Sequence, residues 1–424
     1  MARAVTLPHT PSHADAAPAT RAYQWLALAL GALVFWALYM YSTQFVDGLG
    51  VTGLNRPVFW GLYIANFIFC VGLSAGGIGV SALVHLLERT DMKPVAILAE
   101  VLATSFLFLA ASFIIMDLGQ PTRFFFVFLS PNFSSPLLWD VTAITSYMFL
   151  CVALLYFSAR GELVRRRGQG RWRPLVQLFT LGHTSLSERA LRWDHRFLRT
   201  LAIISIPGAV ALHSVTAWIL GLVKGQPGWN TPILAPLFIA SALVSGLAGV
   251  ILAVLVSRRF FKLEVADDVV QSLAGYLLAL IPVLLYLLFS EFLTVGYSGT
   301  PAHLQVFHEI LFGRFARIFW FDIVVGVLIP LALLALPWTR TPRGIALACL
   351  LVIVGVFAER TYVLLPSLMR QALIPGLVAY HPTAVEWSLM AGAYAAGLLV
   401  FLGLMAFLFG LRSEGRPPRP RYVR

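Results

Sequence analysis

The sequence predicts an all-α integral membrane protein with about ten transmembrane helices. Hydrophobic residues make up 59% of the 424-residue chain, charged residues only 12%, and the mean hydropathy is +0.82. A chain this apolar has lipid as its main solvent. Crossing the hydrocarbon core takes about 20 apolar residues. Such stretches lie at roughly 23–46, 58–84, 95–117, 138–159, 200–222, 232–257, 270–295, 316–337, 344–366 and 387–411.

The segments between and beside these spans are expected to be short or basic. Residues 1–22 are expected to form a disordered arm, residues 23–411 one polytopic helical domain, and residues 412–424 a basic tail. Irregular backbone inside the bilayer would leave amide groups unpaired, which favours a single helical domain. The one sizeable loop, residues 160–199, is expected to carry a short amphipathic helix along the membrane surface.

The net charge of +12 follows a topological pattern. Residues 160–199 contain ten arginines, and the tail adds five more. Cytoplasmic segments of membrane proteins are enriched in Lys and Arg, so we expect this loop and both termini to be cytoplasmic. The basic residues then serve topology and contact membrane lipid, and no nucleic-acid partner is expected.

Metal and haem sites in this chain are not expected. The three cysteines, Cys70, Cys151 and Cys349, lie in separate spans without a CxxC motif, which argues against an iron–sulfur cluster or zinc. A b-type haem needs two facing axial ligands, and His213 is the one histidine clearly inside a span.

The chain contains a weak internal repeat. The segment FIFCVGLSAGGIGVSALV of the second span is similar to LFIASALVSGLAGVILAVLV of the sixth, about 171 residues later. A similar offset relates Asp117, at the end of the third span, to Glu291 near the end of the seventh. Two four-helix units would explain both similarities. Small residues also recur in any packed membrane helix, so this alternative stays open.

Ionisable residues gather near the predicted outer ends of several spans. An ionised side chain at the bilayer centre costs about 2.5–3.5 kcal/mol, so such residues are rare and mostly functional. The set comprises Asp117, Asp140, His213, Glu291, Asp322 and Glu359. Glu291 has no basic residue close in sequence, which favours a functional role.

The other members of this set also have structural explanations. Asp140 and Asp322 begin their spans and could cap helix N-termini, where an acid suits the dipole. Asp117 could pair with Arg123 to hold a re-entrant loop.

Two further residues have similar alternatives. Glu359 could neutralise its neighbour Arg360. His213 could be a packing residue bonded to a hydroxyl such as that of Ser214 or Thr216.

Six motifs give the chain a resemblance to a known family. They are GLSAGG (72–77), MDLGQPTRFF (116–125), LHSVTAWIL (212–220), GWNTPILAPLF (228–238), FAERTYVLLPSL (357–368) and YHPTAVEWSL (380–389). With them the chain resembles the integral membrane subunit of the polysulfide-reductase/NrfD superfamily. The similarity is to the ten-span type found in alternative complex III, DsrP and periplasmic hydrogenase membrane subunits, and it runs over about residues 55–411.

This resemblance implies a fold and a function. The fold is two four-helix bundles, about 58–222 and 232–366, with a flanking helix at each end, in the bacterial inner membrane. The function is binding of quinone or quinol (menaquinone or ubiquinone) near the periplasmic face and electron exchange with a ferredoxin-like iron–sulfur subunit. Behind that partner would stand a molybdopterin enzyme, a hydrogenase or a multihaem cytochrome.

The resemblance also assigns roles to particular residues. His213 and Asp117 match the quinone pocket, with Tyr63, Asn66 and Arg123 as neighbours. Pro207 and Gly208 are expected to loosen the fifth span so that His213 meets the headgroup. A histidine beside a carboxylate can exchange the protons that a quinol carries.

Acids elsewhere are candidates for a proton path. Glu291, Glu359 and Glu386 occupy the second bundle or its rim, and Glu291 is a further catalytic candidate. In the inner half, Glu100 could begin a path, although a snorkelling or capping role is equally open. Two rival functions remain at this point: a secondary transporter, which would also show weak repeats, and a structural membrane anchor.

Overall fold

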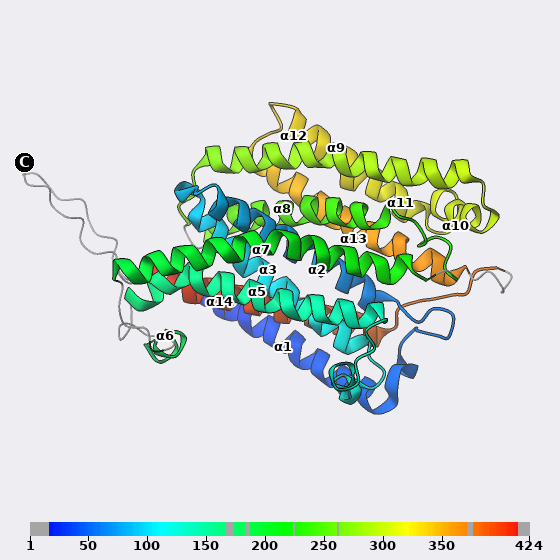
Figure 1. Cartoon of the computed structure of the whole chain (residues 1–424), viewed down its shortest axis with the longest axis horizontal. Helices are drawn as coiled ribbons and strands as arrows, with labels where there is room; N and C mark the ends of the chain where they lie inside the picture. Colours follow the sequence, from blue (N-terminus) through cyan, green and yellow to red (C-terminus); the bar gives the residue numbers. More distant parts are fainter. Residues whose placement is uncertain are drawn as a thin grey trace, which may run out of the picture.

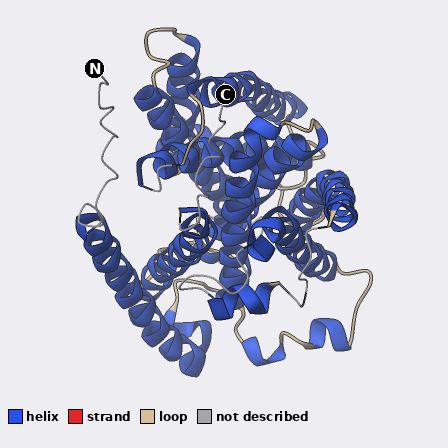
Figure 2. Cartoon of the chain, turned by 90° about the vertical axis from the view of Figure 1, so that its left-hand side faces the viewer, coloured by secondary structure: helices blue, strands red, loops and turns tan. Residues whose placement is uncertain are grey.

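The structure, a computed structural model, describes residues 17–165, 173–180, 182, 187–223, 225–260, 263–370 and 376–413. Every regular element in these residues is helical (Figures 1 and 2). Ten helices among them are long and apolar enough to cross a membrane. The predicted fold class and number of spans are therefore confirmed.

The elements follow one another as alternating long helices and short connecting helices. The first half of the chain contains α1 (Ala17–Asp47), η2 (Gly48–Val51), α2 (Leu62–Leu86), η3 (Thr90–Met92), α3 (Lys93–Asp117), η4 (Pro121–Arg123), α4 (Phe126–Leu129), α5 (Pro136–Arg165), α6 (Arg173–Phe179) and α7 (Glu188–Gly221). The second half contains α8 (Leu234–Phe260), α9 (Asp267–Ser298), α10 (Pro301–Leu311), α11 (Ala316–Phe321), the π-helical segment η5 (Asp322–Leu328), α12 (Ile329–Ala335), α13 (Pro342–Met369) and α14 (Ala384–Ser413).

Some boundaries differ from the expected ones. Helix α7 begins twelve residues before the expected start at residue 200, because Ser187 caps its N-terminus by accepting a hydrogen bond from the amide of Ala190 at 3.3 Å. Helix α1 begins at Ala17, inside the range expected to be a disordered arm. Helix α6 lies in the expected basic loop. Residues 1–16 and 414–424 fall outside the described residues.

The long helices pack as two groups of spans. Helices α2, α3, α5 and α7 contact one another, and α8 contacts α9 and α13, which in turn packs on η5 and α12. Helix α2 also packs along α8 and joins the groups, while α1 and α14 pair on the side of α3 (Figure 1). This packing fits the expected arrangement of two bundles with flanking helices.

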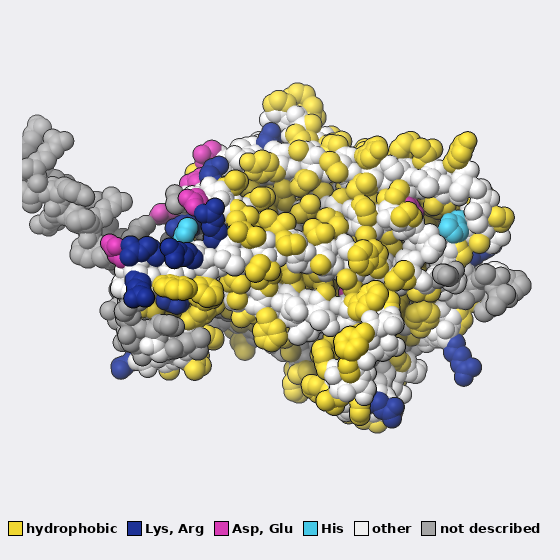
Figure 3. Space-filling model, in the orientation of Figure 1, with side chains coloured by type: hydrophobic (Ala, Val, Ile, Leu, Met, Phe, Trp, Pro, Cys, Tyr) yellow, Lys and Arg dark blue, Asp and Glu magenta, His cyan; other side chains and the backbone are white. Residues whose placement is uncertain are grey.

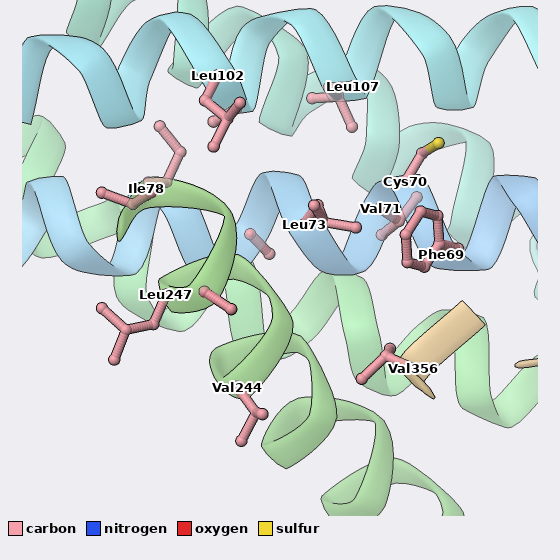
Figure 4. Packing of buried hydrophobic residues seen from close by; sticks show 14 of the residues in the cluster. Phe69, Cys70, Val71, Leu73, Ile78, Leu102, Leu107, Val244, Leu247 and Val356 are labelled. Carbon is pink, nitrogen blue, oxygen red and sulfur yellow. The ribbon is translucent and has the colours of Figure 1, made fainter. Parts of the chain in front are cut away.

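The two groups meet where glycines let backbones approach. A Cβ atom on Gly76 of α2 would lie 2.2 Å from the carbonyl oxygen of Ala242 and 2.7 Å from the Cα of Gly246, both on α8. Figure 4 shows apolar side chains near this crossing. They include Ile78 of α2, Leu102 of α3, and Val244 and Leu247 of α8. Gly76 of the GLSAGG motif therefore sets the distance between α2 and α8 at this crossing.

Charge is distributed unevenly along the long axis. On the face drawn in Figure 3, most Lys and Arg side chains gather at one end of the molecule and hydrophobic side chains cover the middle. We call this the arginine-rich end; it carries Arg89, Arg160, Arg192, Arg199 and Arg258. The opposite end holds the C-terminus of α3 and the N-terminus of α5.

Candidate functional site

A cavity of about 220 Å³ lies at the end opposite the arginine-rich end. Helices α2, α3, α5 and α7 enclose it together with α4 and the loop residues Leu118 and Phe124. Its lining is mostly apolar and aromatic, with Asp117, Asp140 and Thr216 as the polar side chains. The apolar lining includes Trp60, Ile64, Phe67, Ile68, Ile114, Phe124, Val127, Leu137 and Leu220. We call this space the Asp117 cavity.

Asp117 ends α3 and faces this cavity. Its Oδ1 atom is buried and has no hydrogen-bond partner within the described residues. Arg123 lies on η4 with an exposed side chain, and the ion pairs found in the described part of the chain do not join it to Asp117. The pairing considered from the sequence is therefore wrong.

Asp140 is held inside the site by the neighbouring helix. The hydroxyl of Thr216 on α7 donates a hydrogen bond to Asp140 Oδ1 at 2.7 Å, and Thr216 also lies 3.0 Å from the carbonyl of Leu212. Because α5 begins at Pro136, Asp140 lies a full turn inside the helix and does not cap it. The capping explanation is wrong for this residue.

His213 lies beneath the cavity, on the same face of α7 as Thr216 and about 4.5 Å deeper along the axis. Its Nδ1 atom is 3.1 Å from the carbonyl oxygen of Ala209, one turn earlier in the same helix. Its Nε2 atom is buried without a partner in the described residues. The hydroxyl partner considered from the sequence is not the one that His213 uses.

Helix α7 continues without a break through Pro207 and Gly208. A Cβ atom on Gly208 would lie 3.4 Å from the ring of Tyr147 on α5, so the glycine lets that ring pack closely. The local loosening expected around Pro207 does not interrupt the helix, and His213 is positioned by a regular turn.

Tyr63 and Asn66 lie on a different face of α2 from the cavity. The hydroxyl of Tyr63 donates to Gln44 of α1 at 2.8 Å, and Asn66 accepts from the hydroxyl of Tyr394 of α14 at 2.8 Å. Neither residue lines the Asp117 cavity. They attach the flanking helices to α2.

The residues of α2 that line the cavity are Ile64, Phe67 and Ile68, preceded by Trp60. The sequence reasoning missed them. Residues spaced by three and four positions lie on one face of a helix, and this spacing could have identified them in the sequence.

A second, smaller cavity of about 40 Å³ lies in the other group of helices. Glu291 lines it and accepts a hydrogen bond from the hydroxyl of Thr231 at 2.7 Å. Phe292, Val306 and Phe307 fill much of the space around it. Unlike Asp117, which ends α3, Glu291 lies seven residues before the end of α9, and it has a hydrogen-bond partner and little room.

Two clusters of buried groups lie close to the second cavity. The hydroxyl of Tyr362 donates to Asp322 at 2.9 Å, and Asp322 lies inside a continuous helical segment that begins at Ala316, so it caps no N-terminus. The capping explanation is wrong here too. Arg360 lies 3.3 Å from Glu359, which fits the expected neutralisation of these neighbours.

Arg360 has further partners on α8. It donates to Ser241, and its guanidinium lies 4.2 Å from the ring centre of Phe238. With Glu359, Ser241 and Phe238 as partners, Arg360 holds a buried positive charge within the second group of helices.

Glu100 forms a buried cluster near the arginine-rich end. Its Oε1 atom accepts hydrogen bonds from Ser81 at 2.6 Å and Ser158 at 2.9 Å and lies 2.9 Å from His85 Nε2. The side chain is completely buried, and Oε2 has no partner in the described residues. A snorkelling or capping role is therefore wrong for Glu100; we call this set the Glu100 cluster.

At the start of α14, Glu386 accepts hydrogen bonds from three groups. Its Oε2 atom accepts from the amide of Thr383 at 2.9 Å and from the amide of Gly53 at 2.7 Å. Its Oε1 atom accepts from the hydroxyl of Tyr380 at 2.6 Å. Burial, and then the hydrogen bond to Glu386, raise the pKa of Tyr380, so its hydroxyl stays a donor.

The described residues contain no group of three or more His, Cys, Asp and Glu side chains placed to hold a metal ion. The side chains that line the Asp117 cavity offer two carboxylates, a hydroxyl and an aromatic wall.

Known proteins are similar to this chain over most of its length. A Halobacterium salinarum protein provisionally named as a dimethyl sulfoxide reductase membrane subunit is 29% identical over 91% of this chain and 90% of its own length. A selenate reductase subunit of Mesobacillus selenatarsenatis is 30% identical over 77% of this chain and 80% of its own. The Hdr-like menaquinol oxidoreductase integral membrane subunit of Archaeoglobus fulgidus is 27% identical over 89% of this chain and 92% of its own. Residues 50–372 match the family model described as polysulphide reductase, NrfD, so the chain belongs to the NrfD polysulphide reductase family.

Proposed function

We propose that this chain is the quinone-interacting membrane subunit of a respiratory redox complex and that the Asp117 cavity receives the headgroup of quinone or quinol. One observation carries the proposal: a carboxylate oxygen of Asp117 is buried and unpartnered in an apolar, aromatic cavity beside the Asp140–Thr216 pair. The relatives named as subunits of reductases support the role in a redox complex, and the one named for menaquinol supports the ligand.

The chemical character of the cavity fits such a headgroup. An apolar cavity of about 150 Å³ takes up benzene, so about 220 Å³ leaves room for a larger ring system. Small-molecule sites are commonly apolar with a few placed polar groups. Trp60, Phe67 and Phe124 supply the walls, and Asp117 supplies an unused acceptor.

Bound quinol supplies two electrons and two protons as it becomes quinone. The residues of this chain bind the headgroup and accept its protons. Asp117 accepts the hydrogen bond of a ligand hydroxyl and takes its proton, acting as a general base. Thr216 keeps Asp140 oriented toward the cavity, and the free Nε2 of His213, one turn deeper, accepts the next proton.

The electrons need an acceptor, and the described residues offer no cluster of metal ligands to hold one. We propose that a ferredoxin-like iron–sulfur subunit docks at the end that carries the Asp117 cavity. A molybdopterin enzyme, hydrogenase or multihaem cytochrome would complete the assembly. By the positive-inside rule this end is periplasmic in a bacterial inner membrane, and the arginine-rich end is cytoplasmic.

Binding to the purified protein tests the cavity. We expect saturable binding of a fluorescent quinol analogue, with the affinity lowered about tenfold or more in Asp117→Asn, because a buried charge-assisted hydrogen bond contributes about 1.5–3 kcal/mol. We expect a smaller loss of affinity in His213→Ala, because His213 lies beneath the cavity and does not line it. Asp47→Asn is the matched control, since Asp47 is an exposed carboxylate at the same end. Equal affinities in wild type and the three variants would contradict the proposed site, and so would a folded wild type that does not bind the analogue. Solute flux in liposomes would instead indicate a transporter.

We further propose that protons cross the first group of helices to the Glu100 cluster. Asp140, Tyr147 and Ser158 lie on one face of α5, spaced by seven and eleven residues, or about 10 and 16 Å. Together they cover about 27 Å, nearly the thickness of the hydrocarbon core. The row begins in the Asp117 cavity and ends at Glu100.

Unpartnered atoms along this row favour internal water. Besides His213 Nε2 and Glu100 Oε2, the hydroxyls of Tyr147 and Ser74 are buried without partners in the described residues. Buried polar groups are nearly always hydrogen-bonded, so ordered water is the expected partner. In contrast, Glu386 and Glu359 are occupied by fixed neighbours, which makes them weaker candidates for proton transfer.

The proton path is tested in the complete complex in proteoliposomes. We expect Glu100→Gln to keep quinol oxidation in uncoupled vesicles and to lose most of the membrane potential formed in sealed ones. Glu88→Gln serves as the control, because Glu88 is an exposed acid near the same end. An unchanged potential in Glu100→Gln would remove the cluster from any path.

A further inference from the structure

A groove of about 390 Å³ lies at the arginine-rich end. Helices α2, α8 and α9 form it, with a contribution from α7. Only Arg89 and Tyr276 bring polar side-chain atoms to its lining; the rest is apolar or glycine, including Gly79, Leu243 and Leu273. We call it the Arg89 groove.

The groove opens sideways, toward the region that lipid occupies. Leu83, Leu87 and Tyr276 on its wall are each more than half exposed. On the face drawn in Figure 3, hydrophobic side chains cover the surface between α7 and α9, and Lys and Arg gather at one end of it. The groove is therefore reached from within the bilayer and is distinct from the Asp117 cavity at the opposite end.

Its length matches one leaflet. From Gly76 to Leu87 the groove follows α2 for eleven residues, or about 16 Å. Half of the hydrocarbon core is about 15 Å. A lipid chain that enters beside Arg89 would thus reach the midplane beside the crossing of α2 and α8.

The mouth carries charges of both signs. Arg89 donates to Asp91 through Nε at 2.9 Å and Nη2 at 2.8 Å, and this pair lowers the pKa of the Asp91 carboxyl. Asp268 and Tyr276 lie within electrostatic reach of Arg89. A headgroup with a phosphate and an ammonium complements such a mouth: the phosphate suits Arg89, and the ammonium suits the two carboxylates.

We propose that the Arg89 groove is a binding site for one zwitterionic phospholipid of the leaflet at the arginine-rich end. One acyl chain fills the groove, and a headgroup such as phosphoethanolamine lies over Arg89, Asp91 and Asp268. By lying against α2, α8 and α9, the lipid bridges the two groups of helices.

Native mass spectrometry of the purified protein with added phosphatidylethanolamine tests this site. Gly79→Leu fills the groove from α2, and its Cβ atom would meet Leu243 at an ordinary 3.7 Å. Excluding about two methylene groups, at about 0.8 kcal/mol each, lowers retention about tenfold. Leu243→Trp fills the groove from α8 and serves if Gly79→Leu does not fold. Gly403→Leu is the matched control, since a Cβ atom there meets nothing within 4 Å.

Headgroup selectivity is tested with the double variant Arg89→Gln, Asp91→Asn. We expect it to bind phosphatidylethanolamine and phosphatidylglycerol equally, whereas wild type prefers the former. Equal retention by Gly79→Leu and wild type would overturn the site. Displacement of the lipid by menaquinone in wild type would assign the groove to a quinone tail instead, and a preference of wild type for phosphatidylglycerol would overturn the zwitterionic assignment.

Discussion

At the scale of single residues, hydrogen-bond partners separate the buried acids into different roles. Asp117 has an unpartnered oxygen in a cavity, and Glu100 is bonded on one oxygen only. Glu386 has both oxygens bonded to fixed protein donors. An acid with free acceptor capacity can take a ligand or a proton, whereas a saturated one holds the structure together.

Replacing Glu386 should therefore affect stability. Glu386→Ala leaves the amides of Gly53 and Thr383 and the hydroxyl of Tyr380 without their acceptor. Each buried, unsatisfied group costs about 1–3 kcal/mol, so we expect a loss of at least about 2 kcal/mol in the free energy of unfolding. Thermal denaturation in detergent measures it. Glu386→Gln should recover part of the loss, and an unaltered melting temperature in Glu386→Ala would contradict the structural role.

At the scale of elements, glycine positions decide how closely helices cross. Gly76 lies directly against Ala242 and Gly246, whereas a Cβ atom on Gly72, one turn earlier, would meet its nearest neighbour at an ordinary 3.8 Å. The same motif thus contains one glycine that the packing requires and one that it tolerates. Helix α7 gives a second example, because it passes Pro207 without a break and keeps His213 in register with Thr216.

Gly76→Ala should separate α2 from α8. A methyl group there would lie 2.2 Å from the backbone oxygen of Ala242. Because that oxygen belongs to a helix, the two helices would have to separate, and overpacking of this kind lowers the free energy of unfolding by about 1–3 kcal/mol. We expect a clearly lower melting temperature than for Gly72→Ala, the matched control on the same helix. If the two variants melt together, the crossing is looser than the structure indicates.

At the scale of the whole molecule, charge and polar sites lie at opposite ends. The arginines mark one end, and the Asp117 cavity lies at the other. This polarity orders the proposed events, with a quinone site on one side of the bilayer and the Glu100 cluster toward the other. Helices α1 and α14 stand outside this arrangement and are attached by Tyr63 and Asn66.

The orientation can be measured with single cysteines, because the three native cysteines are buried. Tyr297→Cys lies at a 91% exposed position near the end of α9, and Arg189→Cys at an exposed position near the start of α7. In intact bacterial spheroplasts, a membrane-impermeant maleimide should label the first variant only. Inverted membrane vesicles should give the reverse, and the opposite pattern would invert the proposed topology.

Much of the fold was predictable from the sequence, because each membrane span needs about 20 consecutive apolar residues. The ten apolar stretches identify the spans directly, and even Glu359 and Arg360 do not break α13, since they are paired and buried within it. Helix ends were less predictable. The early start of α7 depends on a cap at Ser187 outside the apolar stretch.

The candidate site was predictable only in part. Asp117 stands out as an acid at the end of a span, and the structure brings it into one cavity with Asp140 and Thr216. Tyr63 and Asn66 look equally suitable in sequence but face other helices. Packing against distant helices decides which face of α2 meets which neighbour. The residue pattern of α2 alone does not contain this information.

The sequence alone determined the solvent of this protein, the number of spans and the charge difference between their ends. The first two depend on composition within single stretches of about 20 residues, and the third on the basic segments that flank them. The tertiary structure alone decided which acids are free. Asp117 and Glu291 are both acids in the last third of an apolar span, yet Asp117 faces a cavity of about 220 Å³, whereas Glu291 accepts a hydrogen bond from Thr231 in a cavity of about 40 Å³. The difference arises from side chains of other helices and connecting segments, which fill one cavity and leave the other open.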